Sequence, residues 1–372
     1  MFRLKTLLVC AIVATLVLFG SLLPAGLADG GANHRVRNLN FGVSGGNVND
    51  ISRRFCCSGT LGALLTAGSN QYILSNNHVM GRSGQAIAGE DVSQPGLIDN
   101  NCNVSTVVAD FTVSAPLGPS NVDASIALLR PGLMNSNGSI EDIGVPSSTV
   151  TNASVGLNVA KSGRTTGFTT GQVTATNASV TIAYSASCGG GKKTNVSYTN
   201  QVVISPGTFS AGGDSGSLIV TNNGSHNPVG LLFAGSSSVT IANPIGEVLT
   251  RLSSALGQTL SFGGGGGGGS ASPAGDQGSG GRRPFTPGVE HLMRTLPQQA
   301  SDRALAVLET HRASLMVTPG IIGAGIGESG RADGEAAIIV FVNKNAGQRP
   351  FVPESIDGVP VTVILTDEFV AR

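Results

Sequence analysis

The sequence predicts an all-β fold for residues 38–262, the larger part of the chain. Gly, Ser, Thr, Asn and Val dominate this stretch, and such a composition favours short strands joined by tight turns over helices. Candidate strands and turn signals also alternate closely along it, as in a β-sandwich or barrel. With 372 residues, of which 40% are hydrophobic, the chain is long enough for two or three domains with sizeable cores.

The expected strands begin with a hairpin, in which 61–65 and 71–75 are joined by a turn at 66–70. The further candidate strands are 122–129, 155–159, 171–175, 179–184, 200–204, 217–220, 229–233 and 239–241. At 245–256 the apolar residues recur at helical spacing instead. We therefore expect the β-domain to close with one amphipathic helix.

The first residues have the layout of a secretory signal peptide, which we assign to 1–28. Arg3 and Lys5 precede a long apolar run, and small residues end it at Ala28, where cleavage is expected. An uncleaved membrane anchor is the less favoured alternative, because the run is slightly short for a membrane span. We expect the protein to be secreted or extracytoplasmic, in the cell envelope.

Export leaves four cysteines, Cys56, Cys57, Cys102 and Cys188. An even number in an exported chain predicts two disulfides, with three connectivities open. Neighbouring cysteines do not easily bond to each other, so Cys56 and Cys57 should each reach Cys102 or Cys188. Since no His or Cys cluster has ligand spacing, a metal site is not expected.

The composition changes after the β-domain. Residues 263–287 begin with seven consecutive glycines and continue with Ser, Pro and Gly, which predicts a flexible linker. Beyond it, 289–315 has a helical pattern with a break at Pro297, and three strands are expected at 321–326, 336–342 and 359–365. Residues 288–372 therefore form a small α+β module, in which His291 and His311 are expected to be solvated.

Three short segments carry residues for acyl-transfer chemistry. His78 follows the strand 71–75, Asp123 precedes an apolar strand, and Ser215 lies in a Gly-rich turn before another. A serine hydroxyl needs a base to accept its proton, and a carboxylate fixes the tautomer of a histidine in that role. The chain order His, Asp, Ser is that of the chymotrypsin template. This chemistry needs no cofactor.

Residues 56–256 resemble the chymotrypsin/trypsin-like serine peptidase family, most specifically in the GDSG sequence at 213–216. The segments 75–79, 161–167 and 209–218 further resemble a bacterial-type, exported branch. The resemblance implies two six-stranded β-barrels with a closing C-terminal helix, and His78, Asp123 and Ser215 as the catalytic triad. It also implies an oxyanion hole formed by the backbone N–H groups of Gly213 and Ser215.

The segment 229–236 resembles the family strand that lines the substrate cleft, which makes Phe233 and Gly235 candidate substrate-binding residues. Phe209 occupies the position six before the nucleophile, which sets the charge at the pocket floor in trypsin. Cleavage after Lys or Arg is therefore not expected. We expect a small or apolar residue on the acyl side of the scissile bond instead. Because the family's usual activation start is missing, we do not expect a new N-terminus to pair with Asp214.

Two assignments have rivals in the sequence. Asp110 competes with Asp123 as the triad acid, but Asp123 is favoured by its position before an apolar strand, and Asp110 is expected to be a strand-edge or turn acid. Arg164 could bind a substrate carboxylate, whereas capping or pairing within its hairpin is the more common role.

The sequence thus predicts an exported serine endopeptidase that acts on protein or peptide substrates. Only 12% of the residues are charged and the formal net charge is zero, so no nucleic-acid partner is expected. Two alternatives stay open: a non-catalytic surface-binding protein on a peptidase fold, and a peptidase held inactive by its C-terminal module. The module itself either binds substrate or a surface, or contacts the peptidase domain as a pro-region-like cap.

Overall fold

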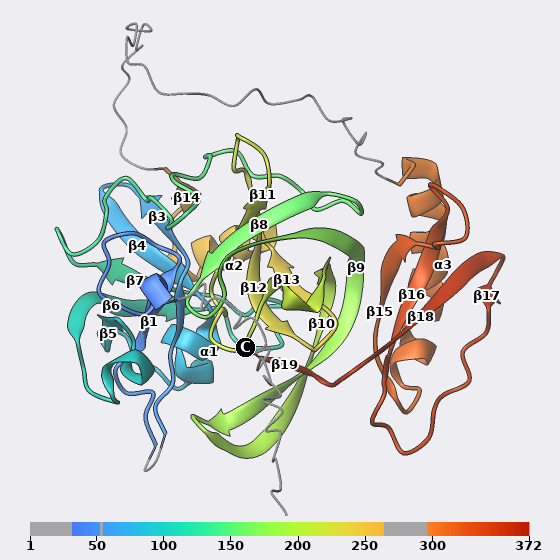
Figure 1. Ribbon diagram of the computed structural model, residues 1–372, viewed down its shortest axis with the longest axis horizontal. Helices are drawn as coiled ribbons and strands as arrows, with labels where there is room; N and C mark the ends of the chain where they lie inside the picture. The colour runs from blue at the N-terminus through green and yellow to red at the C-terminus, as the bar shows by residue number, and fades with distance from the viewer. Residues whose placement is uncertain (1–31, 53–54, 264–295, 372) are drawn as a thin grey trace, which may run out of the picture.

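The computed structural model describes residues 32–52, 55–263 and 296–371. These residues form two β-barrels, side by side, and an α+β module beyond the second barrel (Figure 1). The expected signal peptide at 1–28 lies outside the described residues, as does the expected linker apart from Gly263. Within the described ranges, no helix is long and apolar enough to span a membrane.

The first barrel is an antiparallel sheet that closes on itself. Its strands are β1 (Val43–Asn47), β2 (Gly59–Leu61), β3 (Ala63–Ala67), β4 (Asn70–Ser75), β5 (Asp91–Gln94), β6 (Thr106–Ser114) and β7 (Ser125–Leu129). They are ordered β3-β4-β7-β6-β5-β1-β2. Because only Gly62 separates β2 from β3, the two act as one bent strand, and the sheet forms a closed ring of six. The predicted hairpin is confirmed as β3 and β4.

The second barrel is also a closed antiparallel ring. Its strands are β8 (Asn158–Gly163), β9 (Gly167–Ser187), β10 (Gly190–Ser205), β11 (Leu218–Thr221), β12 (Pro228–Gly235) and β13 (Thr240–Pro244). The ring runs β8-β9-β10-β13-β12-β11 and back to β8. Helix α2 (Ile245–Leu256) follows it, as predicted, and β14 (Ser261–Phe262) returns to pair with β3. The fold is therefore the chymotrypsin-type double barrel.

Several predicted boundaries are wrong. The strands expected at 171–175 and 179–184 are one continuous strand, β9, and β8 begins only at Asn158. Strands β1, β5 and β6 were not expected. The two glycines of β1 carry no apolar pattern, and a bulge between Phe111 and Val113 interrupts the alternation of β6.

The C-terminal module continues the sheet of the second barrel. It contains α3 (Gln298–Met316), β15 (Ile321–Glu328), β16 (Ala336–Asn343), β17 (Ser355–Ile356), β18 (Val359–Thr366) and β19 (Phe369–Ala371). Strand β15 pairs antiparallel with β9. Alternate residues of β16 face opposite ways, so Ile338 packs toward α3 while Phe341 joins the core that contains Phe233 of the barrel.

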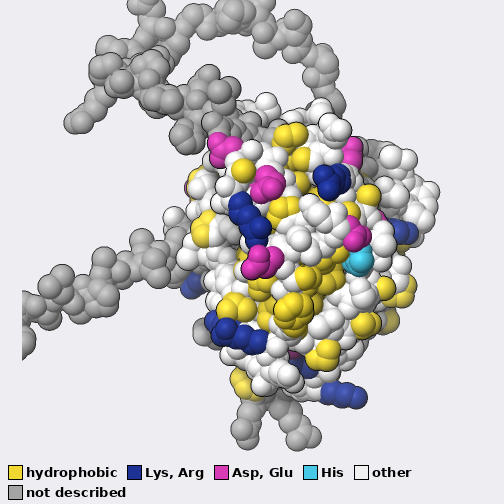
Figure 2. Space-filling view, turned by 90° about the vertical axis from the view of Figure 1, so that its right-hand side faces the viewer, with side chains coloured by type: hydrophobic (Ala, Val, Ile, Leu, Met, Phe, Trp, Pro, Cys, Tyr) yellow, Lys and Arg dark blue, Asp and Glu magenta, His cyan; other side chains and the backbone are white. Residues whose placement is uncertain are grey.

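The outer side of the molecule, which includes the module, carries charges of both signs. Figure 2 shows Lys and Arg interspersed with Asp and Glu over this face, around a central group of hydrophobic side chains. The described secondary structure also includes the one-turn helix α1 (Asn77–Met80) and four short 3₁₀ helices: η1 (Ala32–His34), η2 (Arg82–Gly84), η3 (Leu97–Asn100) and η4 (Gly207–Phe209).

Candidate active site

His78 lies on α1 (Asn77–Met80), a one-turn helix that follows β4. Two buried asparagines fix this helix against the loop before β7. The Asn76 amide donates to the Asp123 backbone carbonyl at 2.6 Å, and the Asn77 amide donates to the Ala115 carbonyl at 2.7 Å. The helix and the aspartate are therefore held together by the backbone as well as by their side chains.

His78 and Asp123 form a close pair. The imidazole Nδ1 lies 2.6 Å from Asp123 Oδ2, and the His78 backbone N–H donates to Oδ1 at 3.1 Å. Asp123 is fully buried, and 13% of the His78 side chain is exposed. A carboxylate at Nδ1 keeps the proton on that nitrogen, which leaves Nε2 as the basic atom.

A tyrosine that the sequence analysis missed also contacts Asp123. The Tyr184 hydroxyl, on β9, donates to Asp123 Oδ2 at 2.8 Å, and the Tyr198 hydroxyl, on β10, lies 2.8 Å from that of Tyr184. Burial raises the pKa of Tyr184 well above its ordinary value, so its phenol stays protonated as a donor. The chain has only three tyrosines, and their rarity was the one available signal.

Ser215 lies in a tight loop between η4 and β11. Gly213 and Gly216 have φ angles of +97° and +95°, which favour glycine, and a Cβ on Gly216 would lie 2.2 Å from the Thr60 carbonyl oxygen. The buried Ser215 hydroxyl donates to the Phe233 carbonyl at 3.3 Å. Neither the Gly213 nor the Ser215 amide donates to an acceptor in the described part of the chain.

Asp214 is fixed by an internal lysine. Lys161 Nζ lies 3.6 Å from Asp214 Oδ2, and both side chains are fully buried. The Asp214 carboxylate also accepts hydrogen bonds from the backbone N–H groups of Thr165, at 2.8 Å, and Ala211, at 2.9 Å. Burial lowers the pKa of Lys161 to about 8, against the opposing effect of Asp214. Lys161 is thus a buried cationic partner of Asp214, a contact that the sequence analysis did not predict.

The three substrate-binding candidates lie at different depths. Phe209, at the end of η4, is buried in the core of the second barrel. The Phe233 ring packs edge-on against Tyr198, with centroids 5.1 Å apart, while its carbonyl faces Ser215. Gly235 ends β12 and pairs with Val370 of β19.

The two rival residues are engaged elsewhere. Asp110 lies within β6 and pairs with Arg130, at 2.6 Å. Arg164 makes a bidentate contact with Asp99, at 2.5 and 2.7 Å. Arg164 thus pairs with a carboxylate of η3, outside its own hairpin.

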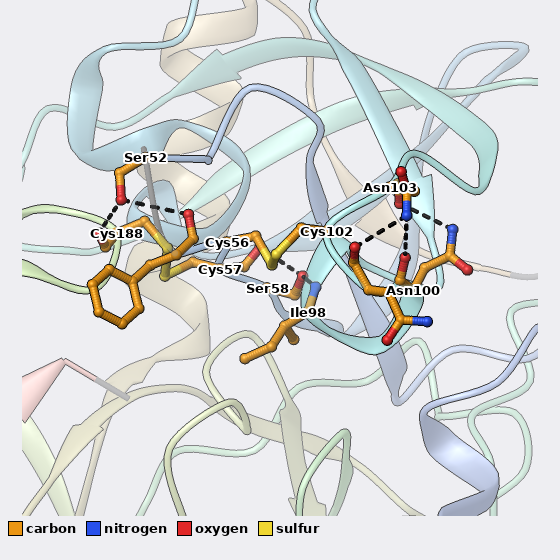
Figure 3. Close-up of a disulfide and its surroundings, with 11 residues drawn as sticks. Ser52, Cys56, Cys57, Ser58, Ile98, Asn100, Cys102, Asn103 and Cys188 are labelled. Atoms are coloured by element: carbon orange, nitrogen blue, oxygen red, sulfur yellow. Dashed lines mark hydrogen bonds between the residues drawn. A yellow bond between two sulfur atoms is a disulfide. The ribbon is translucent and has the colours of Figure 1, made fainter.

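Two disulfides border the site. Cys56 bonds to Cys102, and Cys57 bonds to Cys188 (Figure 3), which confirms the predicted pair of bridges. The second bridge joins the segment before β2 to the turn between β9 and β10, where Ser52 also donates to the Cys188 carbonyl at 3.0 Å. The long β9–β10 hairpin is thereby tied to the first barrel.

A cleft of about 490 Å³ opens over these groups. It is lined by His78, Tyr184 and Gly213, and by Val370 and Ala371 of the C-terminal module. Asp50 also lines it, and burial raises the pKa of that carboxyl to about 6. The cleft therefore brings together groups from both barrels and from the module.

The double barrel is of the chymotrypsin-like peptidase type. The chain belongs to peptidase family S64, whose profile matches residues 72–257. No curated protein matches the chain.

Solved structures also match, over the part that contains the barrels. A glutamic-acid-specific serine protease is 23% identical over 60% of this chain and 98% of its own, with a TM-score of 0.41. A Nocardiopsis protease is 16% identical over 60% and 98%, with a TM-score of 0.40. Thermobifida fusca protease A is 18% identical over 60% and 99%, with a TM-score of 0.38.

Proposed function

We propose that this peptidase is an exported serine endopeptidase, with Ser215 as nucleophile, His78 as general base and acid, and Asp123 as the residue that orients His78. The observation that carries the proposal is the contact between the buried carboxylate of Asp123 and His78 Nδ1, at 2.6 Å. It leaves Nε2 as the basic atom of a histidine that lines the same cleft as Gly213 of the nucleophile loop.

In the first half-reaction, the Ser215 hydroxyl exchanges its hydrogen bond to Phe233 for one to His78 Nε2. Its oxygen attacks the scissile carbonyl carbon while the proton moves to Nε2. The resulting oxyanion accepts hydrogen bonds from the Gly213 and Ser215 amides. As the C–N bond breaks, the imidazolium gives its proton to the leaving amine, and the acyl group stays on Ser215.

In the second half-reaction, water attacks the acyl carbon. His78 accepts a proton from the water and then returns it to the Ser215 oxygen, which releases the carboxylic acid product. Asp123 keeps its hydrogen bond to His78 Nδ1 throughout and stabilises the imidazolium. The Lys161–Asp214 pair supports both half-reactions indirectly, because it holds the loop that presents the Gly213 and Ser215 amides to the oxyanion.

The disulfides support export, since such bonds form and persist in oxidising compartments. For the domain organisation we propose a signal peptide at 1–28, a peptidase domain at 38–262, a linker at 263–287 and a module at 288–372. A small or apolar residue on the acyl side of the scissile bond is the proposed preference.

The proposal is tested by peptide-library digestion with the wild type and with Ser215→Ala. We expect hydrolysis by the wild type and its loss in the variant, with Ser225→Ala, a serine in an exposed turn, unchanged. Absence of hydrolysis by all three proteins, after removal of residues 1–28, would favour one of the two alternatives, a non-catalytic binding protein or a peptidase held inactive by its C-terminal module.

A further inference from the structure

Strand β19 lies beside β12, the strand that contributes Phe233 to the site. In β19, Ala371 pairs antiparallel with Ala234, and Val370 pairs with Gly235. The Ser215 hydroxyl bonds to the carbonyl of the preceding residue, Phe233. Strand β19 therefore pairs with Ala234 and Gly235, the two residues of β12 that directly follow Phe233.

The same strand also contacts the opposite wall of the cleft. Phe369 pairs with Ile182 and Val370 with Ala183, both on β9. Tyr184, the donor to Asp123, is the next residue of β9. Strand β19 thus bridges β9 and β12, and it occupies the backbone pairing positions of Ala234 and Gly235, which an extended peptide would need in order to add to this edge of β12.

Three contacts hold the approach to β19 against the peptidase barrel. The Thr366 hydroxyl donates to Ser236 Oγ at 2.6 Å, and the Ser237 hydroxyl donates to the Asp367 carboxylate. Glu368 pairs with Lys193 at 2.5 Å. The first two partners directly follow β12, so the approach to β19 is held against the end of that strand.

Phe369 anchors the strand from inside. Its side chain is fully buried and packs edge-on against Phe341, with ring centroids 5.6 Å apart. Both rings belong to the same core as Tyr198 and Phe233. Burial of such a ring removes a large apolar surface from water, so the strand is held by packing as well as by backbone pairing.

We propose that residues 369–371 are an intramolecular, substrate-like occupant of the acyl-side half of the cleft, and that the full chain is autoinhibited until this strand is displaced. The inference rests on the proposed serine peptidase function, because it concerns regulation of that same site. This inference differs from the expectation of a cap formed by the whole module, because it assigns inhibition to strand β19 alone. Activation then requires displacement of β19, while β15 stays paired with β9.

The test compares the full chain with a variant that ends at Glu368. This truncation keeps the contacts of Thr366, Asp367 and Glu368. Because a tethered occupant acts at a high effective concentration, its removal should raise kcat/KM for a short peptide by about tenfold or more, chiefly through KM. Equal kcat/KM for the two proteins, both labelled by a fluorophosphonate, would overturn the inference.

A point variant guards against misfolding of the truncated protein. Val370→Asp should activate as truncation does, because it places a charge in the cleft without removing Phe369. The matched control is Val363→Asp on β18, since Val370 is 37% exposed and Val363 45%. The control should behave as the wild type does. Activation by Val363→Asp equal to that by Val370→Asp would count against a specific role for β19.

Binding of the strand is tested without catalysis. A labelled synthetic peptide of residues 366–372 should bind the truncated protein that also carries Ser215→Ala, and compete with peptide substrates of the truncated active protein. No binding in fluorescence anisotropy overturns the inference even where hydrolysis is observed. If no protein that retains Ser215 is labelled by the fluorophosphonate, the proposed serine peptidase function itself is contradicted.

Discussion

The Tyr184 hydroxyl donates a hydrogen bond to Asp123 Oδ2 at 2.8 Å. That oxygen also lies 2.6 Å from His78 Nδ1, so a single carboxylate oxygen serves both residues. Tyr184 comes from the second barrel and Asp123 from the loop before β7 of the first. The contact therefore bridges the two barrels at the carboxylate on which the orientation of His78 depends.

Tyr184→Phe should lower kcat and leave KM nearly unchanged. The variant keeps the ring but removes one donor to a buried carboxylate, and hydrogen bonds to charged groups of this kind correspond to about tenfold to a hundredfold in rate. Steady-state kinetics measure both constants. The control is Tyr198→Phe, whose hydroxyl reaches Asp123 only through Tyr184 and whose effect should be smaller. A larger loss in Tyr198→Phe than in Tyr184→Phe would contradict this account.

Activity should fall as the pH rises through about 8, because burial lowers the pKa of Lys161 to about 8. Above that pH the neutral amine no longer pairs with Asp214, and the oxyanion loop loses its fixed charge. This loss of activity is the alkaline limb of the pH profile of kcat/KM, and steady-state kinetics at a series of pH values measure it. In Lys161→Arg, which stays charged, the limb should disappear; a limb unchanged in this variant would assign it to another group.

The alkaline loss of activity should not be unfolding. The Lys161 pKa is about 8 in the folded protein, against an ordinary value of 10.5. Between these values the unfolded chain binds the additional proton, so this group makes the free energy of unfolding rise with pH. Below about pH 8 both states are charged, and its destabilising effect is fully present. Urea denaturation across the window checks the sign.

Gly213→Ala should lower kcat by about a hundredfold, the loss typical of one oxyanion donor. Gly213 has a φ of +97°, and a Cβ there would lie 2.5 Å from Arg164 Nη1 and from Thr165 Oγ1. The loop must therefore shift, and the amide moves with it. Kinetics with a short peptide measure the effect. Gly246→Ala, whose Cβ would meet no neighbour within 4 Å, is the control and should retain full activity.

Loss of the Cys57–Cys188 disulfide should destabilise the protein more than loss of Cys56–Cys102. The bridges close loops with sequence separations of 131 and 46 residues, for which chain entropy gives about 5 and about 4 kcal/mol. Paired Cys→Ala variants and urea denaturation measure the two free energies. An order opposite to this one would show that strain or unfolded-state structure outweighs loop closure.

The parts of this structure that depend on local sequence pattern could be predicted from the sequence. Helix α2 has its predicted bounds, and β15, β16 and β18 differ from theirs by one or two residues at one end. The three candidate triad residues were identified because each lies beside an apolar strand in a recognisable order. Their mutual distances needed the structure, and only the structure brought His78 and Asp123 together.

The remaining features depend on tertiary contacts that no local pattern indicates. Tyr184 lies in a strand where an aromatic residue is expected for packing alone, and its hydroxyl acquires a role only where β9 crosses Asp123. Lys161 is a charged residue in a largely buried strand, and its partner Asp214 lies 53 positions further along the chain. Strand β19 has three residues, too few for periodicity to predict.

Labelling of Ser215 tests the central claim most directly. A fluorophosphonate probe should form one adduct with the protein, and peptide mass spectrometry should place it on Ser215. The adduct should be absent in Ser215→Ala and much slower to form in His78→Ala, where the base is missing. The truncated variant that ends at Glu368 is the protein to label, because its cleft is open in this account. An adduct on another serine, or none on the truncated protein, would contradict the assignment of Ser215 and His78 as nucleophile and base.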